Sequence, residues 1–232
     1  LVGVAGDCGG VFGLLEQRAE RLVGLQVATL DDERGREPAA LHERLEEIGI
    51  DPPSGRRADH LAAAEHRHRL ELDREAAAML RLADVEPGMG LLDPCCGVGT
   101  ILIEGAVIGA MAQGGDIDSE AVAAARVNAK AAELTVEARE WDARKLPLEN
   151  ASLDRIVTNL PWGRQIKVDD ELGVFYGDVC SEMKRVLVPS GRIAVLTGTP
   201  NLLQFEHLRL HDTIEISLFG QTPMIALYSA IR

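Results

Sequence analysis

The chain has 232 residues, of which 46% are hydrophobic and 26% charged, and its formal net charge is −13. This length accommodates one substantial domain with a small additional segment, in an ordinary globular composition. No run of about 18 consecutive apolar residues indicates a membrane helix, and the first residues lack the basic and apolar parts of a secretory signal. The acidic balance disfavours strong unaided binding of nucleic acid through its phosphates, and we expect a cytoplasmic protein.

The four cysteines are expected to be reduced thiols without reactive chemistry. They are Cys8, Cys95, Cys96 and Cys180. The adjacent pair cannot easily form a disulfide within itself, and no Cys-x-x-Cys spacing indicates a zinc site.

Residues 1–58 differ from the rest of the chain and are interpreted as a small N-terminal extension. Glycines crowd the start, and a charged stretch follows over Asp31–Glu37. A short helix is predicted over Pro38–Ile48, where leucine and isoleucine recur on one face. Asp51–Gly55 would end that helix with turn residues. These signals do not define a fold for the extension.

A helical segment opens the main domain, which is predicted to span residues 59–232. Asp59–Ala83 is rich in Ala, Leu, Glu and Arg, which favour helix, and it is expected to dock on the sheet that follows. Its three histidines, His60, His66 and His68, stand among arginines. Because that context is typical of a solvated helix face, we predict no metal site there.

Short apolar strands then alternate with helices. Strands are predicted at Gly90–Leu92, Ala110–Gly115, Thr135–Glu140, Leu153–Thr158, Arg192–Thr197, His211–Leu218 and Met224–Ile231. Helices are predicted at Thr100–Gly109, Ser119–Ala132 (capped by Asp118 or Ser119) and Leu172–Leu187, with a turn at Pro189–Gly191. This alternation predicts a Rossmann-like α/β domain with a mostly parallel seven-stranded sheet. The last two strands, joined through Gly220–Pro223, are expected to add an antiparallel hairpin.

A glycine-containing loop, Asp93–Thr100, lies between the first of these strands and its helix. In a doubly wound sheet, a nucleotide binds here against a strand end and a helix N-terminus. A dinucleotide fingerprint would need a third glycine at the position of Leu102. Asp93 would repel a pyrophosphate but suits the cationic amine or sulfonium of S-adenosylmethionine. Taken alone, the loop is also compatible with a structural turn.

Two further acids follow the next predicted strands. Asp116 ends the second strand, roughly twenty residues beyond the first glycine of the loop, where a carboxylate can accept hydrogen bonds from ribose hydroxyls. Asp142 follows the third strand and could accept one from an adenine amino group. Each acid alone fits a solvated loop equally well. Three acids after successive strands together favour the methyl donor.

The fourth strand ends in Asn159-Leu160-Pro161-Trp162. A conjugated amino group is a poor nucleophile because its lone pair is delocalised. The side-chain oxygen of Asn159 and the main-chain carbonyl of Leu160 could accept hydrogen bonds from such a group. They would thereby orient its nitrogen and stabilise the positive charge that develops on it. Pro161 would stiffen the loop, and Trp162 offers a face on which a base could stack. Individually, Asn159 is as typical of a turn and Trp162 of a half-buried core.

Together these motifs resemble the THUMP-associated RNA guanine-N2 methyltransferases that act on tRNA, and the related 23S rRNA enzymes. The similarity runs from about His66 to Arg232, with Leu160 in place of the first proline of the Asn-Pro-Pro-Tyr loop of amino methyltransferases. The matching segments are Asp93–Glu104, Gly115–Asp118, Ala125–Asn128, Asn159–Arg164, Phe175–Tyr176 and Glu182–Gly191.

The resemblance implies a class I methyltransferase that uses S-adenosylmethionine to methylate guanine N2 of tRNA or rRNA. The expected donor contacts are Asp93, Cys95, Gly97, Gly99, Thr100, Asp116, Ile117, Asp142, Ala143 and Asn159. The expected catalytic residues are Asn159, Leu160, Pro161 and Trp162. A THUMP module with its linking domain is far longer than residues 1–58, so the N-terminal region is expected to be truncated or divergent.

Several routes to RNA capture stay open because the chain is acidic. The RNA could be held by a partner protein, by an upstream module or by a local basic patch. The candidates for that patch are Arg67, Arg69, Arg74 and Lys167. Each of them alone is more typical of a solvated helix face.

Two other hypotheses are compatible with the same residues. Loops of the Asn-Pro-Pro-Tyr type also serve DNA adenine-N6 and protein glutamine-N5 methyltransferases, and the glutamine enzymes would suit an acidic protein. Gly163-Arg164 after the aromatic residue resembles the RNA group more closely, so these rank second. A non-catalytic binding module on the same fold is the alternative of another class, and the intact series of acids argues against it.

Overall fold

The computed structural model describes residues 74–162, 169–218 and 220–230, with only the backbone described over 169–171. The predicted N-terminal extension, its helix at 38–48 and the three histidines lie outside the described residues. So do the predicted boundary at residue 58 and three members of the proposed basic patch, Arg67, Arg69 and Lys167. Among the described residues, no helix is both long and apolar enough to cross a membrane.

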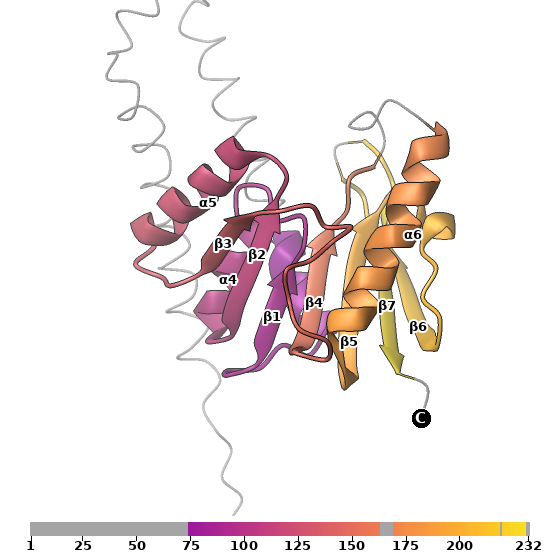
Figure 1. The fold of residues 1–232 in the computed structure, drawn as a ribbon, viewed down its shortest axis with the longest axis horizontal. Coiled ribbons are helices and arrows are strands. Elements are labelled where there is room, and N and C mark those ends of the chain that lie inside the picture. The colour runs from indigo at the N-terminus through magenta and orange to yellow at the C-terminus, as the bar shows by residue number, and fades with distance from the viewer. Residues whose placement is uncertain (1–73, 163–168, 219, 231–232) are drawn as a thin grey trace, which may run out of the picture. The chain divides into compact units, whose positions relative to one another are not determined.

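The described part of the chain forms one seven-stranded sheet between layers of helices (Figure 1). Its strands are β1 Gly90–Asp93, β2 Met111–Asp116, β3 Glu137–Glu140, β4 Leu153–Asn159, β5 Leu187–Thr197, β6 Leu208–Glu215 and β7 Met224–Ala230. Their order is β3-β2-β1-β4-β5-β7-β6. Strands β1 to β5 pair in parallel, whereas β7 is antiparallel to both β5 and β6. The predicted mostly parallel sheet with a C-terminal hairpin is confirmed.

The predicted turn at Pro189–Gly191 is wrong in one respect, because these residues lie inside β5. Leu187 pairs with Leu153, and Arg192 already pairs with Arg155, so five residues of β5 advance while β4 advances only two. The extra residues bulge out of the ladder, and a bulge is where a strand tolerates proline.

Strands β2 and β3 begin one and two residues after their predicted starts, and boundary errors of three residues occur at β6 and at the start of one helix. Strand β6 begins three residues before the predicted His211 and ends at Glu215, because its ladder with β7 runs from Leu208 opposite Ala230 to Glu215 opposite Met224. Its side chains are almost all exposed, so hydrophobic alternation gave little signal there. Helix α6, Asp169–Val186, starts three residues before the predicted Leu172.

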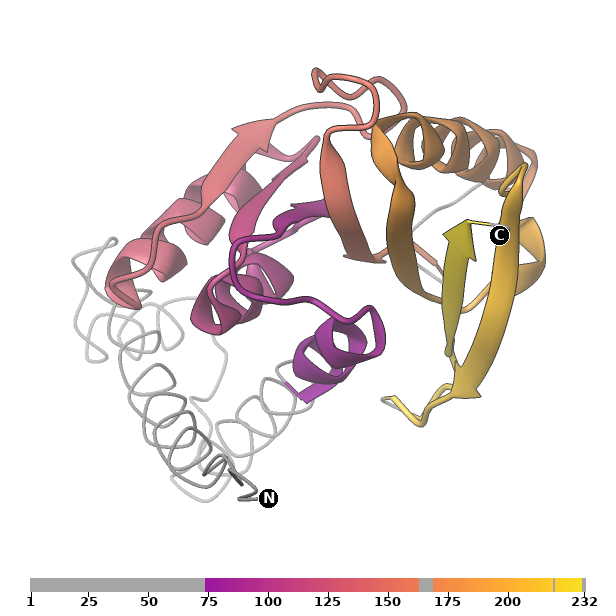
Figure 2. The ribbon, with the colours of Figure 1, turned by 90° about the horizontal axis from the view of Figure 1, so that it is seen from below.

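Helices cover both faces of the sheet (Figure 2). A helix over residues 74–82, α4 (Thr100–Ile108) and α5 (Ser119–Ala131) pack into one buried cluster. Helix α6 packs into the other cluster, together with Trp141 and Leu146. Helix α5 begins as predicted, with the side chain of Asp118 accepting the backbone N–H of Glu120 at 2.9 Å.

The parallel strands bring their carboxyl ends to one edge of the sheet. Asp93, Asp116 and Asn159 close β1, β2 and β4 in turn. The chain therefore gathers residues from positions far apart in the sequence along that edge, as is usual for ligand sites in open α/β sheets.

Candidate functional site

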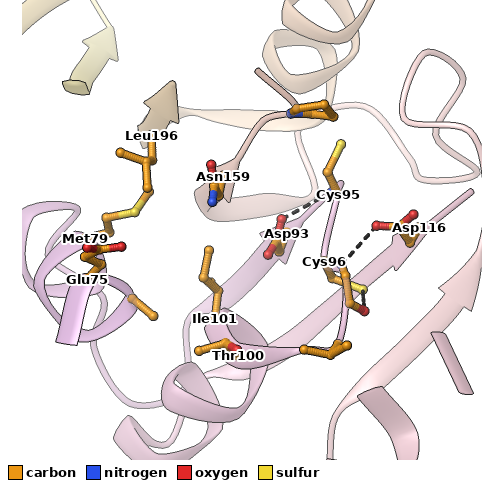
Figure 3. Close-up of a pocket in the computed structure, with 14 residues that line it drawn as sticks. Glu75, Met79, Asp93, Cys95, Cys96, Thr100, Ile101, Asp116, Asn159 and Leu196 are labelled. Carbon is orange, nitrogen blue, oxygen red and sulfur yellow. Dashed lines mark hydrogen bonds between the residues drawn. The ribbon is translucent and has the colours of Figure 1, made fainter. Parts of the chain in front are cut away.

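A cavity of about 330 Å³ opens at this edge (Figure 3). Its lining comes from the ends of β1, β2, β4 and β5, from the first turn of α4 and from the helix over residues 74–82. The lining residues are Glu75, Ala76, Met79, Asp93, Cys95, Cys96, Gly97, Val98, Thr100, Ile101, Asp116, Asn159, Pro161 and Leu196. The volume lies in the range of small-molecule sites.

Most of the predicted donor residues meet in this cavity, together with part of the predicted catalytic loop. Asp93, Cys95, Gly97, Thr100, Asp116, Asn159 and Pro161 all line it. Gly99, Ile117, Asp142, Ala143, Leu160 and Trp162 do not. Their predicted contacts with ligands stay predictions, and the structure places several of them in other interactions.

The wall formed by Glu75, Ala76 and Met79 was not predicted. Met79 lies four residues after Glu75 and three after Ala76 in the helix over 74–82, and side chains at these two spacings share one face of a helix. Helical composition predicted that this segment docks on the sheet. The sequence of this segment carries no signal that its side chains would form a wall of a cavity whose other residues begin at Asp93.

The acidity of the cavity is a plain feature of its lining. Glu75, Asp93 and Asp116 contribute carboxyl groups, and no lysine, arginine or histidine occurs among the described lining residues. Such a lining disfavours a pyrophosphate and suits a ligand that carries positive charge.

Asp93 is buried at the end of β1, and its Oδ1 accepts the backbone N–H of Cys95 at 3.2 Å. The pKa of its carboxyl is raised from 3.8 to about 7, mainly by burial and in smaller part by the nearby charge of Asp116, while the hydrogen bond from the Cys95 N–H opposes the shift. A positively charged ligand in the cavity would favour the ionised form and lower this pKa.

Asp116 joins the loop after β1 to the loop after β2 on one side of the cavity. Its Oδ2 accepts the backbone N–H of Gly97 at 2.9 Å, and its Oδ1 accepts that of Asp118 at 3.1 Å. A carboxylate has about four acceptor positions. Asp116 can therefore hold these loops and still accept hydrogen bonds from a ligand.

The two glycines of the loop differ in what they do. Gly97 lies on the cavity wall, with open space where a side chain would begin. Gly99 has φ +90°, and a Cβ there would come 2.9 Å from the Cβ of Ala125 on α5. Gly99 therefore lets α5 pack against the loop, and the cavity does not reach it.

Asp142 lies outside the cavity, with both of its oxygens bound to Arg144. The Arg144 side chain donates to Oδ2 at 2.7 Å and the Arg144 backbone N–H donates to Oδ1 at 2.9 Å. These hydrogen bonds lower the pKa of Asp142. Next to Asp116, the side chain of Ile117 is 71% exposed and offers a free apolar face, whereas Ala143 is buried.

The cysteines of the cavity are neutral thiols. Burial raises the pKa of Cys95 and of Cys96 well above their ordinary value, and Asp93 and Asp116 raise both further. A thiolate is the reactive form of cysteine, so the expectation of unreactive thiols agrees with this environment. Cys95, Cys96 and Cys180 are all free.

Three hydrogen bonds fix the loop after β4: one to β5, one within the loop and one from α6. The Leu160 backbone N–H donates to the Leu196 carbonyl at 3.1 Å, which continues the ladder toward β5. The indole Nε1–H of Trp162 donates to Oδ1 of Asn159 at 2.9 Å. The Leu160 side chain is fully buried and packs in the core cluster that contains Tyr176 and Leu203.

The third hydrogen bond comes from Tyr176 on α6. Its buried hydroxyl donates to the carbonyl of Pro161 at 3.1 Å and lies 2.6 Å from the Thr197 hydroxyl. The Thr197 oxygen also accepts the backbone N–H of Thr199 at 3.0 Å. This chain of hydrogen bonds connects α6, the end of β5 and the loop.

Comparison with known proteins places this domain among methyltransferases. The family model described as the RMKL-like methyltransferase domain matches residues 72–208, more than half of the chain. The tRNA (guanine(6)-N2)-methyltransferase of Thermus thermophilus is 39% identical over 133 residues, which are 56% of this chain and 40% of that protein. The human U6 snRNA (guanine-N(2))-methyltransferase THUMPD2 is 35% identical over 147 residues, 62% of this chain and 27% of that protein.

Among solved structures, TrmN from Thermus thermophilus superimposes with a TM-score of 0.61 at 33% identity, over 67% of this chain and 48% of that one. The putative methyltransferase SMU.472, solved in complex with SAH, gives a TM-score of 0.59 at 16% identity, over 69% of this chain and 53% of that one. The chain therefore spans about half or less of the length of these relatives. Its described domain has the fold of the class I methyltransferases.

Proposed function

The chain belongs to the family of RMKL-like methyltransferase domains, and on that premise we propose that it transfers a methyl group from S-adenosylmethionine to an exocyclic amino group. We infer that this group is the N2 amino group of guanine in RNA, with tRNA as the first candidate. The observation that carries the proposal is that Asp93, Asp116 and Asn159 line one cavity.

The residues present fit S-adenosylmethionine. This donor carries an activated methyl group on a sulfonium cation, and the cavity has carboxyl groups and no basic side chain among its described lining residues. Asp116 would accept the ribose hydroxyls, and Asp93 would face the positive charge of the methionine part. The backbone beside Gly97 is open to close approach.

Asn159 would bind the acceptor on the opposite wall of the cavity. Its Oδ1 accepts one hydrogen bond from Trp162 and keeps a second lone pair. That lone pair and the Leu160 carbonyl would accept the two N–H bonds of the amino group. S-adenosylmethionine, when bound, would supply an electrophilic methyl group, and these two acceptors would turn the nitrogen lone pair toward it and hold the N–H bonds whose proton is lost to solvent. Orientation and stabilisation of charge on nitrogen supply the catalysis.

Guanine N2 is supported by what the relatives act on. Their names specify guanine N2 in tRNA or in U6 snRNA, and this chain aligns with only part of each. A net charge of −13 makes capture through phosphates by this chain alone unfavourable. We therefore infer that a partner or a further module holds the RNA, with Arg74, exposed on the helix over 74–82, as a possible contribution. A cytoplasmic location belongs to the same proposal.

The test is transfer of labelled methyl from S-adenosylmethionine to total tRNA, rRNA, DNA and protein, followed by mass identification of the product. We expect N2-methylguanosine in tRNA, and transfer reduced at least roughly a hundredfold in the Asn159→Ala variant. N6-methyladenine in DNA or N5-methylglutamine in protein would replace the guanine assignment. If calorimetry shows no binding of S-adenosylmethionine, the proposal fails and a binding module takes its place.

A further inference from the structure

The hydrogen bond between Trp162 and Asn159 has a consequence for catalysis. We propose that Trp162 is a positioning residue, whose indole N–H decides which end of the Asn159 amide stands where the acceptor amine binds. This inference goes beyond base stacking as the role of Trp162. Its functional part rests on the proposed function, whereas its structural part does not.

The amide of asparagine has two ends of similar shape and opposite character. Its oxygen accepts hydrogen bonds and its nitrogen donates them, and rotation about the terminal torsion exchanges the two at little cost. Only the oxygen can accept a hydrogen bond from an amino group. Asn159 is half-buried at the cavity, so some neighbouring group has to distinguish its two ends.

Trp162 makes that distinction because an indole nitrogen can donate but cannot accept. Its Nε1 lies 2.9 Å from Oδ1 of Asn159. If the amide rotated by half a turn, the N–H of Trp162 would face the NH₂ of Asn159, and two donors would meet. The bond leaves one lone pair of Oδ1 for the amine. Figure 3 shows Asn159 among the side chains that line the cavity.

The ring of Trp162 is itself fixed by the sheet. A Cβ at Gly198, just beyond β5, would come 2.6 Å from Cε3 of the indole, so the ring lies directly against the backbone there. Trp162 also packs against the buried cluster that contains Leu196 and Ile225. Because β5 fixes the indole and the indole binds Asn159, the orientation of the Asn159 amide depends on the position of β5. The same packing covers part of the ring, so less of its surface is open for stacking than the sequence suggested.

The hydrogen bond can be tested without any substrate. The chain has two tryptophans, and the indole N–H of the other, Trp141, donates to the Pro94 carbonyl at 3.1 Å. In a ¹⁵N-labelled sample, two indole signals can be assigned with Trp162→Phe. We expect Asn159→Ala to shift the Trp162 signal and accelerate its hydrogen exchange, with the Trp141 signal as internal control. A Trp162 indole proton unaffected by this variant overturns the proposal.

The catalytic consequence is tested with an isostere of tryptophan. Benzothienylalanine at position 162 keeps the ring shape and loses the N–H donor. With the RNA that the wild type methylates, we expect kcat to fall roughly three- to tenfold, the loss of one hydrogen bond. We expect KM for S-adenosylmethionine, and calorimetric affinity for its product, to be unchanged. An unchanged or increased kcat contradicts the proposal, as does an equal loss of donor affinity.

A second variant approaches the same bond from β5. Gly198→Ala leaves residues 159–162 intact but displaces the indole, so it should lower kcat, as the isostere does, and shift the Trp162 indole signal, as Asn159→Ala does. If Gly198→Ala moves the signal without any change in kcat, positioning is refuted. If the wild type neither binds the donor nor transfers methyl, the proposed function fails, while the spectroscopic result on the bond still stands.

Discussion

The two walls of the cavity are built on different physical principles. The wall at the ends of β1 and β2, which we propose binds the donor and call the donor wall, uses carboxyl groups that accept backbone N–H groups, as Asp93 does from Cys95 and Asp116 from Gly97. The acceptor wall, at the ends of β4 and β5, uses neutral groups. There Trp162 and Tyr176 hold Asn159 and Pro161 through single hydrogen bonds.

This difference separates binding from orientation. Charge on the donor wall acts over several ångströms and tolerates small displacements, so it suits the retention of a cationic ligand. Hydrogen bonds on the acceptor wall act over a narrow range of distance and angle, so they suit the alignment of a weak nucleophile. We therefore expect changes on the donor wall to appear in affinity and changes on the acceptor wall to appear in kcat.

The largest effect is expected at Asn159. Asn159→Ala removes the oxygen that would accept the amine, and loss of one preorganised group of this kind costs roughly 10²–10³-fold in kcat. Affinity for S-adenosylmethionine, measured by calorimetry, should stay within about twofold. Transfer near the wild-type rate would remove Asn159 from the mechanism, and a parallel loss of donor affinity would erase the distinction between the walls.

Asp116 is the corresponding test of the donor wall. Asp116→Ala should weaken S-adenosylmethionine binding by about 10–100-fold, since hydrogen bonds to a charged group contribute about 1.5–3 kcal/mol. Asp118→Ala is the matched control, because this neighbouring acid caps α5 and does not line the cavity. The control should lose about 1 kcal/mol of stability and keep its affinity. Unchanged donor binding by Asp116→Ala would refute the ribose assignment.

A pH dependence is expected from Asp93, whose pKa is about 7. If the ionised form binds the cationic donor, affinity should rise roughly tenfold from pH 6 to pH 8, and Asp93→Asn should lose that dependence. Stability without ligand should change in the opposite direction. Because the folded pKa is raised from 3.8 to about 7, the free energy of unfolding decreases as pH rises between these two values and levels off above the folded pKa. A flat affinity profile in the wild type would contradict the assignment.

The smallest effect is expected at Tyr176. Tyr176→Phe removes the hydroxyl that donates to the Pro161 carbonyl and should lower kcat several-fold, with about 1 kcal/mol lost in stability and donor affinity retained. Tyr228→Phe is the control, because that residue packs in the same buried cluster on β7, away from the loop. Equal effects of the two variants on kcat would show that Tyr176 acts only through general stability.

The sequence alone predicted best those features that depend on residues close together in the chain. Asp118 capping α5 and the apolar strand before Asp93 both reflect interactions between residues close in the chain, and both were predicted. The bulge in β5 and the extent of β6 were not, because the ladders with β4 and β7 define them. The packing of Gly99 against Ala125 of α5 was not predicted either, because it joins the loop to a separate helix.

The sequence by itself determined the class of fold, the acidic donor loops and the residue types at the end of β4. These depend on hydrophobic periodicity and on residues that immediately follow a strand. Only the tertiary structure decided that the helix over 74–82 closes the cavity with Glu75 and Met79. It also decided that Trp162 binds Asn159 and that Tyr176 supports Pro161. Those contacts join separate strands and helices, and no spacing along the chain encodes which side chains meet once the sheet has brought them together.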